Sequence, residues 1–355
     1  MPDLAGEAEM LEWANISFGE EDTYRLQKAM KRLAVMSGAE ALGFVGKIYG
    51  TEKDYWIVNG RLTSSEEPVE AGVEPRGEGV NQFVFWVTDN LLNDWIQLPD
   101  CKPEQIIVAR QIKHIFSGNL NATIDTNPKF PGKERHLLRA QLARIFAATA
   151  LAPKGLFVME EAEEEGAVVE PKFAEEFTIP GTEELKSAEA WTNLHPQISM
   201  SGVTRHVAPS NITDLDERKA WEDDKATTDK LVTRFETSLV DHTAVPGFTS
   251  AWTSKIVGDV QPFSVVNPKE GAPGTVSYGV NVIRSNRWPG AVTVAKGGKF
   301  TSIYVGYGLK RGGTTQMPSA PEEVIADPEE PKEMPEPTPL TEPEVVADPN
   351  VENQS

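Results

Sequence analysis

Histidine and cysteine are the side chains that most often bind metals or act as nucleophiles, and this chain contains few of them. It has one cysteine, Cys101, and five widely separated histidines. No two histidines have the close spacing of a helical zinc pair, and a single thiol cannot form a thiolate metal site. We therefore expect no metal and no cofactor; a histidine site assembled by the fold from distant positions is the alternative. The histidines are His114, His136, His195, His206 and His242.

Three Gly-Lys pairs resemble the end of a phosphate-binding loop: Gly46-Lys47, Gly132-Lys133 and Gly298-Lys299. Each lacks the earlier glycine and the following serine or threonine, so the phosphate cradle and the magnesium ligand are both missing. The sequence also lacks a Gly-x-Ser-x-Gly elbow and a dinucleotide-binding glycine motif. With so many glutamates, a coincidental carboxylate pair is expected without a catalytic role. We expect no catalytic residues.

The side chains best suited to recognition are tryptophans, tyrosines and arginines in predicted strands and turns, because they bury a large area and keep a polar group. The segment Arg284 to Trp288 carries two arginines and a tryptophan directly before the turn signal Pro289-Gly290. We interpret it as a protein interface; the alternative is that Trp288 fills a hairpin and the arginines pair with local carboxylates. The candidate interface residues are Arg284, Arg287, Trp288, Tyr304 and Tyr307.

Three amphipathic helices must position these residues. The first follows Glu20-Glu21-Asp22 and stops at Gly38, and its apolar face predicts packing, with dimerisation as the alternative. The second runs from Pro103 to Phe116, with Gly118 as its stop. The third runs from His136 to Thr149, with an apolar stripe at helical spacing. Its arginines, Arg135, Arg139 and Arg144, lie mostly off that stripe.

Strand patterns lie on both sides of these helices, which predicts an α+β fold. Residues 42–49 and 55–62 form a predicted hairpin, followed by strands at 81–88 and 95–98. Near the other end, residues 291–295 and 300–307 form a second predicted hairpin after a strand at 276–284. We expect antiparallel sheet regions in the N- and C-terminal parts, packed with about three helices and followed by an acidic disordered tail.

Composition divides the chain into five segments. We expect a flexible N-terminus over 1–18 and an α+β part over 19–159. A glutamate run opens an acidic linker and poorly predicted region over 160–245. A β-rich part follows over 246–312. Residues 313–355 are rich in proline and glutamate and poor in aromatics, so we expect them to be disordered.

The charge of the chain excludes several classes of partner. The net charge is −20 and the isoelectric point is near 4.8. Nucleic acid, an anionic membrane and the acidic surface of a microtubule would all repel such a chain, unless a local basic patch intervened. The single cysteine fits a reducing compartment. We also expect no signal peptide and no membrane-spanning segment.

Two ordered blocks of sequence point to a family. The first block comprises Ile106–Arg110, Ile112-Lys113, Phe116–Leu120, Phe130-Pro131-Gly132 and Leu138–Ile145. The second comprises Val282–Asn286, Trp288–Ala291, Gly298-Lys299-Phe300 and Ile303–Gly308. Together with Gly46–Thr51, they resemble the radial spoke head protein 4/6 family of the motile-cilium axoneme. One departure is Val45, where the family usually has tryptophan.

The resemblance implies a structural subunit of the radial spoke head in cilia and flagella. Such a subunit would pair with a like 4/6 subunit, contact other head and stalk subunits, and meet the central pair projections. It would relay signals that regulate dynein-driven motility. Two alternatives are kept: a cytosolic enzyme that binds an anionic small molecule near the C-terminal hairpin, and an acidic assembly chaperone.

Overall fold

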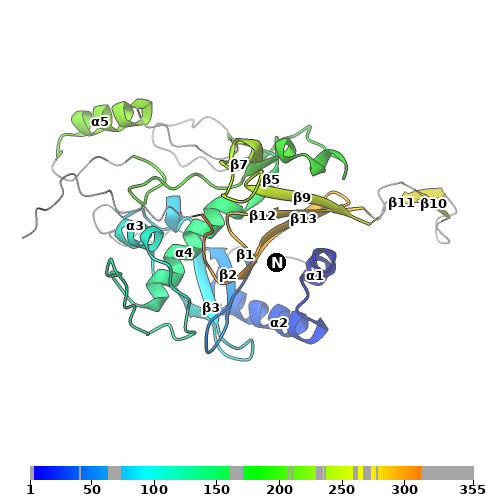
Figure 1. Cartoon of the computed structure of the whole chain (residues 1–355), viewed down its shortest axis with the longest axis horizontal. Coiled ribbons are helices and arrows are strands. Elements are labelled where there is room, and N and C mark those ends of the chain that lie inside the picture. Colours follow the sequence, from blue (N-terminus) through cyan, green and yellow to red (C-terminus); the bar gives the residue numbers. More distant parts are fainter. Residues whose placement is uncertain are drawn as a thin grey trace, which may run out of the picture. The chain divides into compact units, whose positions relative to one another are not determined.

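A computed structural model gives the arrangement of most of the chain. It describes residues 4–39, 41–62, 73–159, 171–206, 208, 212–228, 235, 237–258, 263–266, 273–276 and 279–312. These residues form an eight-stranded sheet, three small two-stranded sheets and five α-helices, so the fold is mixed α+β as predicted (Figure 1). Within the described ranges, no helix is long and apolar enough to cross a membrane.

The eight-stranded sheet joins the two ends of the described chain. Its strands are β1 (Ala41–Ile48), β2 (Tyr55–Arg61), β3 (Val84–Thr88), β4 (Ile96–Gln97), β9 (Trp252–Val257), β12 (Val280–Ser285), β13 (Ala291–Lys296) and β14 (Lys299–Gly306). Their order is β4-β3-β2-β1-β14-β13-β12-β9. All neighbours are antiparallel except β1 and β14, which are parallel with Gly46 opposite Tyr304. The two predicted sheet regions are therefore one sheet.

Helices cover both faces of this sheet. The helices are α1 (Leu4–Glu12), α2 (Glu20–Ser37), α3 (Pro103–Gln111), α4 (Glu134–Thr149) and α5 (Leu215–Thr228). Helices α1 and α2 lie on one face, and α3 and α4 lie on the other (Figure 1). The small sheets pair β5 (Leu151–Pro153) with β8 (Trp191–Asn193), β6 (Phe157–Met159) with β7 (Pro171–Phe173), and β10 (Phe263–Val266) with β11 (Pro273–Val276). Short 3₁₀ turns occur at Gly79–Asn81, Glu184–Lys186, Ala188–Ala190 and Leu239–Asp241.

The strand β2 shows why both faces of the sheet must be covered. Its side chains alternate between faces, as in any strand. Tyr55 and Ile57 pack into the core beneath α3 and α4, whereas Trp56 and Val58 pack into the core beneath α2. Because both sets are apolar, leaving either face open would expose a large hydrophobic surface to water.

Helix α2 matches its prediction at both ends. It begins at Glu20, and Gly38 follows its last residue with a φ of 65° in the left-handed region that glycine tolerates best. Its apolar face, which includes Leu26, Met30 and Leu33, is buried against the sheet of the same chain. The packing interpretation is therefore confirmed for this face, and the dimerisation alternative is wrong because the face is already covered.

Helix α3 ends earlier than predicted. It stops at Gln111 because the next residue, Ile112, is extended with a φ of −104° and a ψ of 152°. Gly118 therefore does not cap this helix. It has a φ of 96°, and a Cβ there would collide with the backbone of Lys53, so glycine is required by the close approach of two loops.

Two further parts of the structure were not predicted from sequence. Residues 4–12 form α1, which packs Met10 and Leu11 against strands of the C-terminal half. In the interval expected to be a linker, Leu185 and Trp191 are buried beside Ile283. The proposed tail, 313–355, and the glutamate run, 160–170, lie outside the described residues.

Candidate functional site

Two of the five predicted interface residues belong to the core. Trp288 and Tyr304 are each 2% exposed and pack with the side chains of α3 and α4. The Tyr304 hydroxyl accepts a hydrogen bond of 2.9 Å from the backbone N–H of Gly308. A partner protein cannot reach either ring in this fold. Both residues therefore have the core role that was the alternative to an interface.

The other three predicted residues are accessible but lie apart. Arg284 donates to the carbonyl of Ala14, whereas Nη2 of Arg287 donates to the carbonyl of Thr243 at 2.6 Å. Tyr307 is exposed and packs against the ring of Tyr49. The two arginines therefore contact different segments, and both bind backbone carbonyls where carboxylate partners had been the alternative. The prediction that these three residues form a protein interface stays a prediction.

Arg287 belongs to a group of positive charges that the sequence did not reveal. Arg110 at the end of α3, Arg144 in α4 and Lys310 after β14 complete this group, which we call the basic cluster. Lys310 is under the electrostatic influence of the three arginines. The four residues come from four separate segments, and only the fold brings them together. Two of the four residues carried a signal in the sequence: Arg144 lies off the apolar stripe of its helix, a position that it shares with two other arginines of that helix, and Arg287 stands beside a tryptophan before a turn.

Arg144 forms the buried floor of the basic cluster. It is 9% exposed, and its Nη1 donates to the carbonyl of Ala109 at 2.6 Å and to Oε1 of Gln141 at 2.8 Å. Its guanidinium lies over the ring of Trp288, 5.3 Å from the centroid. Arg110 donates to the carbonyl of Ile198 at 2.9 Å. These partners satisfy hydrogen bonds, but they are neutral and leave the positive charges uncompensated.

No carboxylate of the described residues lies within ion-pairing distance of the basic cluster. Burial, with a smaller effect of Arg110, lowers the pKa of Arg144 to about 10. Burial and then the three neighbouring arginines lower the pKa of Lys310 to about 8. Both shifts mean that the site disfavours its own positive charge, which a bound anion would stabilise.

Replacing Lys310 with glutamine tests this electrostatic description. The folded pKa is about 8 and the usual value is 10.5, so between them the unfolded chain binds more protons than the folded chain. Lys310 therefore destabilises the fold most at pH values below about 8, where its side chain is charged in both states. As the pH rises from about 8 to 10.5, this destabilisation becomes smaller. We expect Lys310→Gln to be more stable than wild type at neutral pH, with the advantage shrinking as the pH approaches 10.

Urea unfolding at several pH values measures this difference. Wild type and variant share all other titrating groups, so their difference isolates Lys310. Lys113→Gln is the matched control, because Lys113 is an exposed lysine near the end of α3. A stability difference between Lys310→Gln and wild type that stays constant with pH would contradict a lowered pKa.

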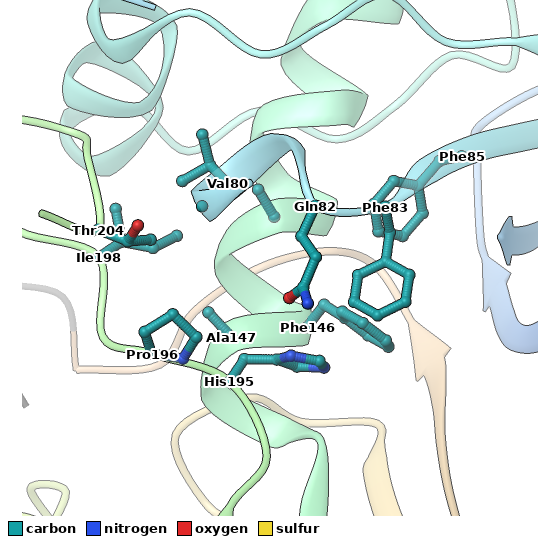
Figure 2. Close-up of a pocket in the computed structure, with 12 residues that line it drawn as sticks. Val80, Gln82, Phe83, Phe85, Phe146, Ala147, His195, Pro196, Ile198 and Thr204 are labelled. Atoms are coloured by element: carbon teal, nitrogen blue, oxygen red, sulfur yellow. The ribbon is translucent and has the colours of Figure 1, made fainter. Parts of the chain in front are cut away.

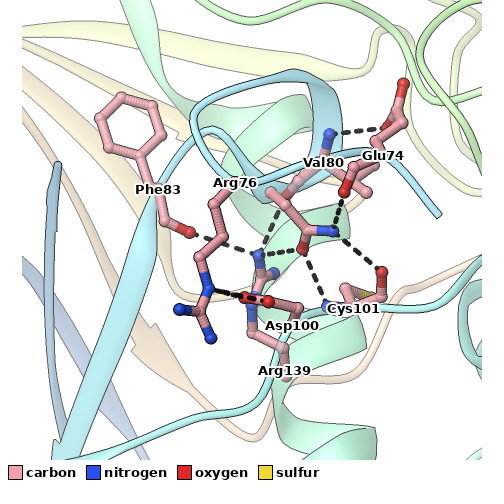
Figure 3. Close-up of polar contacts among 8 residues, drawn as sticks. Glu74, Arg76, Val80, Phe83, Asp100, Cys101 and Arg139 are labelled. Atoms are coloured by element: carbon pink, nitrogen blue, oxygen red, sulfur yellow. Dashed lines mark hydrogen bonds and ion pairs between the residues drawn. The ribbon is translucent and has the colours of Figure 1, made fainter. Parts of the chain in front are cut away.

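A second buried arginine, Arg139, has a structural role. Its Nη2 donates to the carbonyl of Val80 at 2.8 Å, to Oδ1 of Asn81 at 3.1 Å and to the carbonyl of Phe83 at 3.3 Å (Figure 3). Its guanidinium also lies 4.8 Å from the centroid of the Phe85 ring. Arg139 therefore holds the segment before β3 against α4.

Asn81 extends this network to the segment before α3. Its Nδ2 donates to the carbonyls of Glu74 and Cys101, and its Oδ1 accepts from the N–H of Cys101 at 2.8 Å. Arg76 pairs with Asp100 at 2.8 Å beside it (Figure 3). Cys101 itself is fully buried, and burial raises its pKa to about 11, so it is a protonated core thiol and a poor nucleophile.

A small cavity lies next to this network, between α4 and the segment around His195. Phe83, Phe146 and His195 close one side of it, with His195 stacked on Phe146 at 4.4 Å (Figure 2). Its volume of about 30 Å³ holds a water molecule or two, whereas ligand pockets are typically roughly 300–1,000 Å³. Its lining residues do not include the Arg284–Tyr307 hairpin, where Trp288 and Tyr304 fill the space. The geometry of this cavity and hairpin does not favour a substrate pocket.

Across the described positions, no three His, Cys, Asp or Glu side chains converge as metal ligands do. The guanidinium and ammonium groups of the basic cluster are suited to recognition of an anion.

Comparison with known proteins connects the chain to one family. A family model described as "Radial spokehead-like protein" matches residues 1–72 and 63–345. "Flagellar radial spoke protein 4" of Chlamydomonas reinhardtii is 29% identical over 90% of this chain and 69% of its own length. "Radial spoke head protein 6 homolog A" of Xenopus tropicalis is 30% identical over 87% of this chain and 66% of its own length. "Radial spoke head protein 4 homolog A" of Homo sapiens is 27% identical over 92% of this chain but only 50% of its own length.

Proposed function

Because this chain belongs to the radial spokehead-like protein family, we propose that it is a structural subunit of the radial spoke head in the axoneme of cilia and flagella. The observation that carries the proposal is the match of the family model from residue 1 to residue 345. Its partners are then other radial spoke subunits, among them a like 4/6 subunit and proteins of the head and stalk.

The positions in the fold of the two blocks that resemble the family support a structural role. Leu138 and Ile145 of the first block share one core with Trp288, Ala291 and Tyr304 of the second block. These residues, on which the resemblance to the family rests, thus lie where they determine packing.

We further propose that the subunit meets the central pair projections and takes part in the signalling that regulates dynein-driven bending. The net charge of −20 supports a contact that is transient and tuned by charge. Such a contact must weaken as salt screens it. If raising the salt concentration left spoke-to-central-pair contact unchanged, this part of the proposal would be wrong.

Fractionation of a flagellated cell that expresses a tagged copy tests the main proposal. After detergent removes the membranes, we expect the protein to pellet with the axoneme and to resist a mild salt wash. Tagged tubulin marks the pellet and a tagged soluble enzyme marks the wash. Recovery of the protein with the soluble marker would overturn the structural role and favour an assembly chaperone.

A further inference from the structure

The basic cluster is unusual for so acidic a chain. The sequence has 54 acidic and 34 basic side chains, so a positive group should readily find a carboxylate. Arg110, Arg144, Arg287 and Lys310 nevertheless gather with no carboxylate from the described part of the chain in ion-pairing distance. Partly buried charges without a counterion destabilise a fold. A bound anion would remove this penalty.

The cluster combines one buried positive charge with three that solvent can reach. Arg144 is the buried floor, and Arg110, Arg287 and Lys310 are only partly buried around it. Each guanidinium has five N–H donors, and the hydrogen bonds that we observe use few of them. The remaining donors suit the paired oxygens of a carboxylate or a phosphate group.

Two apolar side chains lie against arginines in or next to the basic cluster. Met200 is 82% exposed, and its sulfur lies 3.5 Å from Nη1 of Arg110. Phe248 is 39% exposed and lies beneath the guanidinium of Arg311, whose backbone N–H donates to the carbonyl of Arg287 at 2.8 Å. A free inorganic anion would gain no binding energy from these apolar side chains, whereas a peptide with acidic and apolar residues would contact both the positive charges and the apolar side chains.

We propose that the basic cluster binds a carboxylate-rich segment of a partner protein, with apolar residues of that segment packing on Met200 and Phe248. The partner's carboxylates supply counterions to Arg110, Arg287 and Lys310. The site gives an acidic protein a local means of attracting another acidic chain. This proposal rests on the proposed function in one respect: the partner is expected among the proteins that surround the radial spoke head.

Fluorescence anisotropy with the purified full chain tests the proposal. The probe is a labelled peptide of alternating glutamate and leucine pairs, and the reference probe has glutamine in place of glutamate. We expect the glutamate peptide alone to bind, with an affinity that falls as salt rises. The double variant Arg110→Gln/Arg287→Gln should weaken binding on the order of tenfold or more, because it removes two guanidinium groups that form charge-assisted hydrogen bonds with carboxylates.

The matched control is the double variant Lys28→Gln/Lys31→Gln, which changes the net charge equally at exposed positions of α2, on the opposite face of the sheet from α3 and α4. It should bind the peptide as wild type does. If both double variants weakened binding equally, the loss of affinity would come from net charge alone, and the proposed binding site would be wrong. If Arg110→Gln/Arg287→Gln fails to fold, Lys310→Gln serves in its place, because it removes a charge that burial and the three arginines disfavour and so should not destabilise the fold.

Two further arms separate the chemical sources of the anion. Binding of a phosphoserine version of the glutamine peptide, with no binding of the glutamate peptide, would overturn the carboxylate assignment in favour of a phosphate. Binding of inorganic phosphate alone would overturn the peptide assignment. Since all arms use the isolated chain, their failure is distinguishable from failure of the protein to pellet with the axoneme.

Discussion

Replacing Gly46 with alanine will destabilise the fold by about 3–5 kcal/mol, because two independent penalties add. Gly46 has a φ of 136°, which residues with a Cβ rarely adopt. It also lies opposite Tyr304, and an added Cβ would collide with the Tyr304 carbonyl oxygen. The alanine variant must therefore either separate β1 from β14 or distort both strands. Thermal unfolding should show a midpoint lower by about 10 °C or more.

Gly19→Ala is the control for the first penalty. Gly19 also has a positive φ, of 78°, but a Cβ there would have no heavy atom within 4 Å. Its replacement should cost only about 1 kcal/mol. If Gly46→Ala is too unstable to purify, soluble yield relative to Gly19→Ala gives the same comparison. Equal stability of the two variants would show that β1 and β14 do not need their close approach.

Replacing Glu134 with alanine should destabilise the fold by roughly 3 kcal/mol or more, since it removes the shared acceptor of four donors. The Glu134 carboxylate is fully buried at the start of α4. It accepts from the Tyr55 hydroxyl at 2.8 Å, the Ser117 hydroxyl at 2.8 Å, and the backbone N–H groups of Ser117 and Gly118 at 2.9 Å each. Two of these donors are backbone groups that no compensating mutation can remove. Urea unfolding measures the loss.

Two other variants locate the source of that loss. Tyr55→Phe removes one donor and leaves the others satisfied, so it should cost about 1 kcal/mol. Glu104→Ala changes an exposed acidic residue in the first turn of α3 and should cost less than about 1 kcal/mol. A Glu134→Ala variant as stable as Glu104→Ala would mean that water satisfies the orphaned donors and that the carboxylate is dispensable.

The sequence predicts those elements whose stabilising interactions are local. Helix α2 was predicted to within a residue because its acidic start, apolar face and terminal glycine all lie in one short stretch. The hairpin β1–β2 was predicted because a polar loop separates two strand-like runs. By contrast, the glycine signal at Gly118 was misread. A glycine required by contact with Lys53 looks the same in sequence as a glycine that ends a helix.

The candidate site could not be predicted from sequence, because its residues meet only after the chain has folded. Arg110, Arg144, Arg287 and Lys310 have no common spacing and lie on a helix end, a helix face, a turn and a loop. The prediction identified Arg287 for its neighbourhood of arginine and tryptophan. It also selected Trp288 and Tyr304, since large aromatic residues serve cores and interfaces alike and only burial distinguishes the two.

The parallel pairing of β1 with β14 also affects how the chain folds during its synthesis. When β1 leaves the ribosome, its neighbouring strand at Lys299–Gly306 has not yet been synthesised. At roughly 5–20 residues per second, the delay is on the order of 10–50 seconds. During that time β1 presents an unpaired edge that can recruit strands of other nascent chains. A premature stop before Lys299 makes the delay permanent, so the product is not a smaller working subunit but a chain left with an open edge.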